Sequence, residues 1–459
     1  MAEPIAVIGG SVAGLVAADA LASSGRPVRL ILPARGVGGG FLPMIVGEHA
    51  LELGPRLIEL AYDDDVLAAP PLRDYRPGPH GHRPYLRLVH DLVSELAGAD
   101  LVEATRPQLV RNGVRVLDFL LCGDLIDLPR VVTEVERAAI AAESAAAVER
   151  GGAAGMLAPE REGALWATSL AQASATNHGP TFHALFIEAI AAKVVPGGSA
   201  DVLAALRRKI WLPLFHPATL RDAATGQLTY RPQRPLHTVV PGGMGALVKG
   251  LLGRARANGA IVEERGGLTR LAPAAAGNVE VGYADGTGEQ LSHPVIAGSA
   301  DEVFKAVGIE AVVARSRTVV AWIGVPDDQL DAPPSTLFVP DVANPLYRVS
   351  QSMASTSPGV VVLTCELRCD TAADKAGATA LRALCDIGLL DAPTGDVLHA
   401  VAVDSFVAPS AANDAALRGA VDALAAQELS VEIIGGASGS GADSFNEQVV
   451  QGLAAAERL

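Results

Sequence analysis

The chain opens with a short apolar run that leads directly into glycine. Ile5–Ile8 is typical of a strand buried on both faces of a parallel sheet, and Gly9-Gly10-Ser11-Val12-Ala13-Gly14 follows it at once. The Ala/Leu-rich stretch 15–22 then predicts a helix, and Val28–Leu32 predicts a second buried strand. This order predicts a βαβ unit whose glycine loop lets a phosphate approach the backbone amides at a helix N-terminus.

Two positions depart from the usual dinucleotide-binding pattern. Ser11 stands at the middle glycine of Gly-x-Gly-x-x-Gly, where its small side chain leaves the approach open and its hydroxyl can donate to a phosphate. The second strand ends in Leu32-Pro33-Ala34-Arg35, where an acid normally binds ribose hydroxyls, and no acid lies between Asp19 and Glu48. A plain strand-to-helix turn therefore remains the alternative interpretation of the loop.

Length and charge exclude several other classes of protein. The 459 residues exceed the roughly 250–300 at which single cores stop growing, which predicts two domains. Because acidic residues outnumber basic ones by 51 to 36, nucleic acid is not an expected partner. No apolar run reaches the ~18–20 residues of a membrane-spanning helix, and the start has no basic segment of a signal peptide. We therefore expect no stable membrane insertion and a cytoplasmic location; a homodimer is compatible with the sequence.

Cysteine and histidine spacing gives no sign of a metal site. The four cysteines, Cys122, Cys365, Cys369 and Cys385, form neither a disulfide framework nor a zinc-type pair of motifs. Hydrolase and kinase motifs such as Gly-x-Ser-x-Gly or a P-loop are also missing from the sequence. We therefore expect no metal and no nucleophilic triad.

Further motifs extend the N-terminal pattern over almost the whole chain. They are Ala34-Arg35-Gly36-Val37-Gly38-Gly39, Leu53-Gly54-Pro55-Arg56, Val240-Pro241-Gly242-Gly243-Met244-Gly245-Ala246-Leu247, Tyr347-Arg348-Val349-Ser350, and Gly435-Gly436-Ala437 with Phe445-Asn446. In this order they resemble the flavin-containing superfamily of amine oxidases, protoporphyrinogen oxidases, phytoene desaturases and UDP-galactopyranose mutases. Pro33 replaces the glutamate usual in that superfamily, and Gly436-Ala437 replaces its Gly-Asp or Gly-Arg.

The resemblance implies an α/β fold in which a Rossmann-like FAD-binding domain is interleaved with a substrate domain made of a mixed sheet plus helices. The implied FAD-binding domain comprises 1–60, 236–305 and 425–459, and the substrate domain comprises 61–235 and 306–424. FAD is the implied cofactor. The residues implied to bind it are Gly9, Gly10, Ser11, Ala13, Gly14, Arg35, Gly38, Gly39, Pro55, Arg56, Gly435, Gly436 and Asn446.

Candidate residues for substrate binding and catalysis come from the second half of the chain and from the histidines. Arg348 offers a planar fork for a carboxylate or phosphate, and Tyr347 can flank the same pocket. His183 is a candidate catalytic proton donor or acceptor, and His216 a candidate substrate contact. The alternatives are a surface ion pair for Arg348 and hydrogen-bonded structural roles for both histidines.

Three functions follow from this pattern. The first is an FAD-dependent oxidoreductase, an oxidase or dehydrogenase, that oxidises or desaturates a small-to-medium organic substrate by hydride transfer to flavin N5. The second is a redox-neutral flavin-dependent isomerase or mutase acting on an anionic, nucleotide-sugar-like substrate. The third is a non-catalytic relative whose flavin site has decayed.

Overall fold

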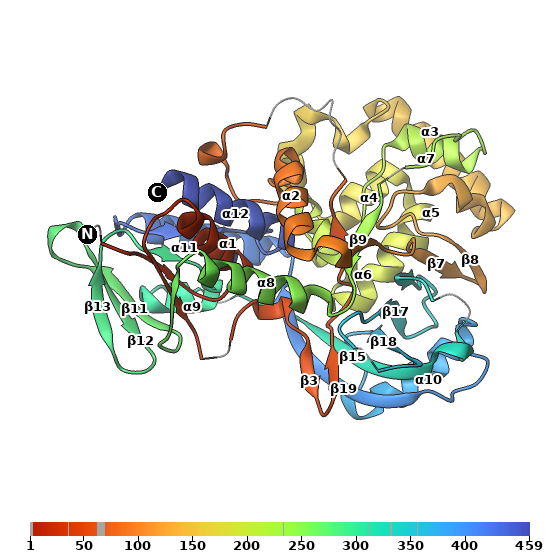
Figure 1. The fold of residues 1–459 in the computed structure, drawn as a ribbon. Coiled ribbons are helices and arrows are strands. Elements are labelled where there is room, and N and C mark those ends of the chain that lie inside the picture. Colours follow the sequence, from red (N-terminus) through yellow and green to blue (C-terminus); the bar gives the residue numbers. More distant parts are fainter. Residues whose placement is uncertain are drawn as a thin grey trace.

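The computed structural model describes residues 3–34, 36–61, 69–232, 234–311, 313–330, 333–355 and 357–459. A five-stranded parallel sheet with the strand order β10-β2-β1-β14-β20 forms the core of one half of the molecule. Figure 1 shows this half on the left, where the N and C marks lie. The strands of this sheet are β1 (Ile5–Ile8), β2 (Val28–Leu32), β10 (Ile261–Glu264), β14 (Val295–Ile296) and β20 (Glu432–Ile433). Segments that lie far apart in the sequence are therefore neighbours in this sheet.

Both faces of the parallel sheet are covered. On one face, Val7 and Leu30 pack against helices α1 (Val12–Ser23), α2 (Leu86–Ala97), α8 (Gly243–Ala257) and α12 (Phe445–Arg458). On the other face, Ile8 and Ile31 pack against α9 (Ala300–Ala306), α11 (Ala411–Ala425) and the antiparallel strands β11 (Leu268–Pro273), β12 (Val279–Tyr283) and β13 (Gly288–Leu291). Burial on both faces explains why the strands of this sheet are continuous apolar runs.

A seven-stranded mixed sheet with the order β19-β15-β18-β17-β16-β7-β8 forms the base of the other half. Its strands are β7 (Gln108–Arg111), β8 (Val114–Leu117), β15 (Arg315–Pro326), β16 (Thr336–Phe338), β17 (Leu346–Gln351), β18 (Val360–Leu367) and β19 (Asp396–Val407). Helix α10 (Ala376–Asp386) covers one face. The hairpin of β3 (Met44–Val46) and β4 (His49–Leu51) packs around Trp322 on the other.

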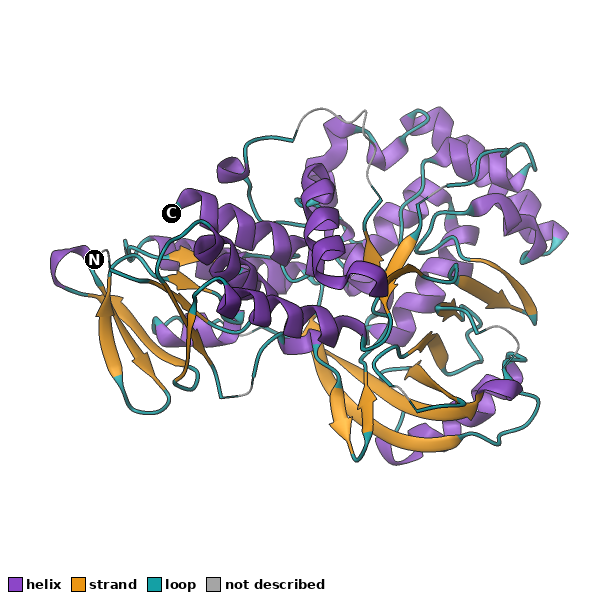
Figure 2. Ribbon diagram, in the orientation of Figure 1, coloured by secondary structure: helices purple, strands orange, loops and turns teal. Residues whose placement is uncertain are grey.

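Helices gather above this sheet in the second half (Figure 2). They are α3 (Glu134–Gly151), α4 (Leu170–His178), α5 (Pro180–Phe182), α6 (Ala189–Val194) and α7 (Pro217–Ala224). Their apolar faces form one core around Phe182, Phe186 and Ile190, which reaches the sheet at Phe338 and Tyr347.

A small three-stranded sheet connects the two halves. It consists of β5 (Ile58–Glu59), β9 (Leu236–Val239) and β6 (Leu101–Glu103). The parallel sheet, the mixed sheet and the helical layer confirm the predicted α/β class. The proposed division of the chain into two domains remains a prediction. No helix in the described part of the chain is long and apolar enough to cross a membrane.

Candidate functional site

The glycine loop forms the N-terminus of α1 as the sequence predicts. Ser11 is the N-cap residue of the helix, and its Oγ accepts a hydrogen bond from the Gly14 amide at 3.3 Å. Gly9 has φ of +120°, and a Cβ atom at this position would lie 2.4 Å from the Ala297 carbonyl oxygen. A Cβ at Gly14 would lie 2.7 Å from the Ala297 side chain. The first and last glycines therefore allow β1, α1 and the end of β14 to pack closely.

The structure brings three of the predicted glycine segments together at this helix end. The Gly38 amide donates to the Gly10 carbonyl oxygen, which fixes the loop containing Gly38 and Gly39 beside the first segment. A Cβ at Gly435 would lie 3.4 Å from Ser11 Oγ, so the C-terminal glycine segment also meets this point. Gly436 follows beside the start of α9. Glycine backbone from three parts of the chain thus surrounds the N-terminus of α1, whose dipole favours an anion.

Helix α12 reaches the same place with its first turn. Gln448 Oε1 accepts a long hydrogen bond of 3.4 Å from the Ala13 amide. Asn446, predicted to bind the cofactor, donates its Nδ2 to the Glu59 carbonyl oxygen of β5. Sequence analysis missed Gln448, which carries no motif, because only the packing of α12 on α1 places it there.

The end of β2 has Pro33 where a ribose-binding acid is usual, but a carboxylate is present nearby. A small pocket there is lined by Gly9, Ile31, Pro33 and Gly298, and also by Glu302 of α9. Glu302 Oε1 accepts a hydrogen bond from the Leu268 amide at 2.7 Å, which fixes its orientation. Sequence analysis did not find Glu302, because it lies far along the chain from β2.

Arg56 lies between the glycine segments and the second half of the molecule. Its Nη2 donates to the Gly40 carbonyl oxygen, and its guanidinium lies 5.7 Å from the centre of the Phe41 ring. Its Nε is buried and has no hydrogen-bond partner among the described residues. Burial lowers the pKa of Arg56, while the charges of Glu52 and Glu366 oppose this effect. Pro55, its predicted neighbour in the site, is buried beside it.

Arg348 belongs to a buried cluster rather than to an exposed strand. In the register of β17 and β18 it lies opposite Glu366, and its Nε and Nη2 donate to the two carboxylate oxygens at 2.6 and 2.8 Å. The Tyr347 hydroxyl also donates to Glu366, at 2.5 Å. Arg348 is 6% exposed, so the alternative of a surface ion pair was wrong: the pair is buried.

Aromatic rings complete this cluster. The Arg348 guanidinium lies 5.3 Å from the ring centres of Trp211 and Tyr347. Burial, together with the charge of Glu366, raises the pKa of Tyr347 well above its usual value, so the phenol stays protonated. A Cβ at Gly54 would lie 3.2 Å from Arg348 Nη2, which places the segment of Arg56 directly against the cluster.

The predicted histidines lie elsewhere. His183 begins the π-helical turn His183–Glu188, where burial lowers its pKa, and His216 is an exposed residue preceding α7. Within the described ranges neither histidine forms a hydrogen bond or a ring contact with Arg348. Arg35 lies outside the described residues. In the part of the chain that the structure describes, no group of three His, Cys, Asp or Glu side chains is arranged to hold a metal ion.

Comparison with known proteins gives structural matches only. No family model matches the sequence, and no curated protein matches it. A reduced UDP-galactopyranose mutase superposes with a TM-score of 0.73 at 14% identity, covering 100% of this chain and 94% of the mutase. Putrescine oxidase bound to putrescine gives 0.62 at 15% identity, covering 99% and 98%. The fatty acid isomerase from P. acnes gives 0.59 at 15% identity, also covering 99% and 98%.

The chain has the fold that these solved structures share. The resemblance drawn from the sequence motifs is therefore confirmed at the level of the fold. Because the same fold serves oxidases, a mutase and an isomerase, it does not select one reaction.

Proposed function

We propose that the chain binds FAD and is an FAD-dependent oxidoreductase acting on a small-to-medium organic substrate. The observation that carries this proposal is the convergence of three glycine segments on the N-terminus of α1. Backbone amides from glycine at a helix N-terminus suit a diphosphate, because no side chain blocks its approach and the helix dipole favours its charge. When bound, FAD supplies a hydride acceptor that no side chain offers.

The residues present fit such a cofactor along its length. Gly9–Gly14, Gly38, Gly39 and Gly435 would hold the diphosphate. Ala13 donates only a long hydrogen bond to Gln448, which a diphosphate oxygen would replace at little cost. Glu302 would take the ribose hydroxyls in place of an acid after β2. Arg56, with a buried Nε that lacks an acceptor, would face the ring end of the cofactor.

The Arg348 cluster would form the substrate side of the site. Glu366 holds the guanidinium rigid through two hydrogen bonds, and the nearby rings of Trp211 and Tyr347 exclude water. The hydrogen bonds of Arg348 to Glu366 use Nε and Nη2, so Nη1 is the donor that would face a substrate. A rigid cationic group of this kind orients a polar substrate without itself transferring a proton.

The decisive test is a spectrum followed by anaerobic reduction. Freshly purified protein, or protein titrated with FAD, is expected to show bound-flavin absorbance. A panel of amines, alcohols and carboxylic acids is then added without oxygen, and one class should bleach this absorbance. A colourless protein that takes up no FAD would instead support the decayed site.

A redox-neutral isomerase or mutase is the second candidate. Two arginines favour it. Arg56 and Arg348 are close enough for their charges to interact, and the carboxylate of Glu366 interacts with both of them. Such an environment suits an anionic substrate. Product of unchanged mass, formed only after the flavin has been reduced beforehand, would favour this candidate over the first.

A further inference from the structure

A second cationic feature lies on the 3₁₀ segment Ala204–Ile210, next to the Arg348 cluster. Trp211, the residue after the segment, lies under Arg348, and Lys209 forms an ion pair of 2.9 Å with Asp443 just before α12. The segment therefore touches both the proposed substrate side and the chain that leads to the glycine loop. Arg207 and Arg208 belong to the same segment and directly precede these two contacts in the sequence.

Arg207 has an unused donor edge. Its Nη1 donates to the Ala204 carbonyl oxygen at 2.8 Å, but its Nε is buried without a partner among the described residues. It forms no ion pair with a described carboxylate. The free edge, Nε with Nη2, is the edge of a guanidinium that binds two oxygens of one carboxylate or phosphate. A buried charged donor without an acceptor is costly, so such an edge is unusual unless a ligand completes it.

The surroundings of Arg207 are cationic. Burial, and then the charges of Arg208 and Arg83, lower its pKa to about 10, so it remains charged at neutral pH. Burial and the same arginines lower the pKa of His80 to about 2, so His80 is neutral and can donate one hydrogen bond. Arg83 is exposed and makes no ion pair within the described residues.

The acids that interact with the neighbours of Arg207 form no ion pair with Arg207 itself. Asp118 is buried, and its carboxylate accepts hydrogen bonds from the amides of Leu120, Leu121 and Cys122. The negative charges of Glu59 and Asp118 favour the charged form of Arg208 and so oppose the lowering of its pKa by burial. Arg208 donates to the Leu120 and Leu121 carbonyl oxygens. Asp443 is held by Lys209. The positive charge of Arg207 is therefore left for a group from outside the chain.

We propose that Arg207, assisted by Arg208, Arg83 and His80, binds the oxyanion of the substrate, either a carboxylate or a phosphate ester. This deepens the proposed function, because it places an anionic group of the substrate next to the Arg348 cluster. Arg207 would accept the anion side-on through Nε and Nη2. Arg83, at the exposed end, would attract it from solvent.

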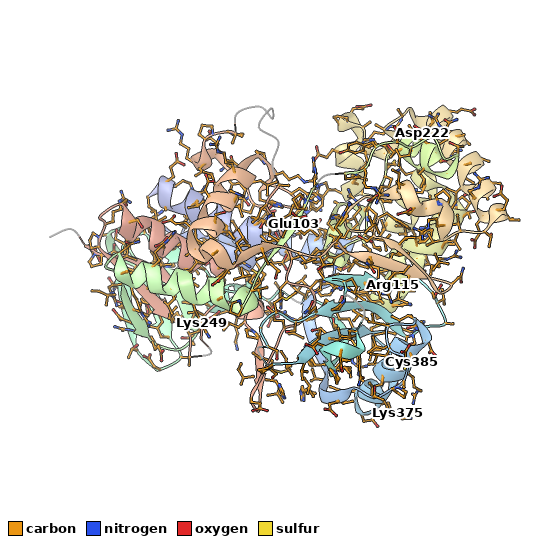
Figure 3. The ribbon with its side chains drawn as sticks, turned by 45° about the vertical axis from the view of Figure 1, so that its right-hand side comes forward. Glu103, Arg115, Asp222, Lys249, Lys375 and Cys385 are labelled. Carbon is orange, nitrogen blue, oxygen red and sulfur yellow. The ribbon has the colours of Figure 1, made fainter. Side chains whose placement is uncertain are left out.

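The test is calorimetric titration of sodium phosphate and, separately, sodium acetate into the protein at constant ionic strength set with sodium chloride. The variants are Arg207→Gln, Arg207→Lys and Arg83→Gln. The matched control is Arg115→Gln, since Arg115 on β8 is also half-buried and donates only to a carbonyl oxygen, that of Gly388. Arg115 lies at the edge of the seven-stranded sheet, near Cys385 (Figure 3).

For the wild type we expect saturable binding of at least one anion. Arg207→Gln should weaken it at least tenfold, Arg207→Lys and Arg83→Gln less, and Arg115→Gln not at all. Binding of phosphate alone identifies a phosphate ester, and binding of acetate alone identifies a carboxylate. Binding of neither anion, or equal binding by the wild type and Arg207→Gln, would overturn the proposal.

Thermal unfolding of the ligand-free variants adds a second readout. Because Arg207→Gln removes a buried charge that lacks a partner, we expect its melting temperature to equal or exceed that of the wild type. A lower value would assign Arg207 a structural role. Neither measurement requires flavin turnover. If the protein takes up FAD but binds neither anion, only the proposed anion site is refuted. If it binds an anion through Arg207 but takes up no FAD, only the proposed cofactor is refuted.

Discussion

Replacing Ser11 with aspartate separates the two tasks of the glycine loop. The aspartate carboxylate can accept the Gly14 amide as the serine hydroxyl does, and a negative charge at a helix N-terminus stabilises the helix by about 0.3–1 kcal/mol. The same charge opposes a diphosphate at the amides of Ala13 and Gly14. At an effective dielectric constant of about 20, two like charges repel by about 4 kcal/mol at 4 Å and about 2 kcal/mol at 8 Å. We therefore expect the Kd for FAD to rise roughly 30- to 700-fold.

The assay is fluorescence titration of FAD into Ser11→Asp, the wild type and a control variant. Ser169→Asp is a suitable control, because Ser169 caps α4 in the same way by accepting from the Gln172 amide, far from the glycine segments. Without FAD, both variants should melt at or slightly above the wild-type temperature, and only Ser11→Asp should lose affinity for FAD. Unchanged FAD affinity in a folded Ser11→Asp protein would refute the placement of the diphosphate at α1.

Two further predictions concern buried and partly buried ion pairs. Glu366→Ala leaves Arg348 as a buried cation without its partner, so it should lower the free energy of unfolding, measured by urea titration, by about 3–5 kcal/mol. Arg137→Met is the control, because its partner Glu134 is exposed, and it should change the free energy of unfolding little. An equally small effect of both variants would contradict the buried pair. The Arg29 guanidinium, with Arg265, lowers the pKa of Glu263 to about 2, so this carboxylate contributes stability that is fully present above pH ~4.5 and is lost as the pH falls toward 2. Arg29→Met should therefore reduce the difference in unfolding free energy between pH 6 and pH 3. An unchanged difference would contradict the assignment.

Local patterns predicted the N-terminal unit well. The apolar run and the glycines placed β1, α1 and β2, because a buried parallel strand and a glycine turn leave clear local signals. Helix α3 begins at Glu134, where Thr133 and Glu136 form a capping box, which is also a local signal in the sequence. Helix α2 was missed, although its buried residues Leu86, Val89, Leu92 and Val93 follow helical spacing.

The substrate side was less accessible to sequence reasoning. Arg348 was found as a candidate, but its partner Glu366 was not assigned a role, because the pairing depends on the register of β17 and β18 and on a shift in that register before Arg348. The unused edge of Arg207 was also invisible, since it depends on which carboxylates the fold leaves out of reach. Non-local pairing and burial of charge are set by tertiary packing, which no short window of sequence contains.

The strand order of the parallel sheet has a consequence for biosynthesis. Ile8 of β1 pairs with Ile296 of β14, β14 pairs with β20, and α1 packs on α12, which begins at Phe445, so this half joins segments that are synthesised far apart in time. The complete sheet and the α1–α12 contact can therefore form only after these later segments have been made. The proposed diphosphate site, which includes Gly435, is therefore complete only when α12 and the segment before it have docked on α1.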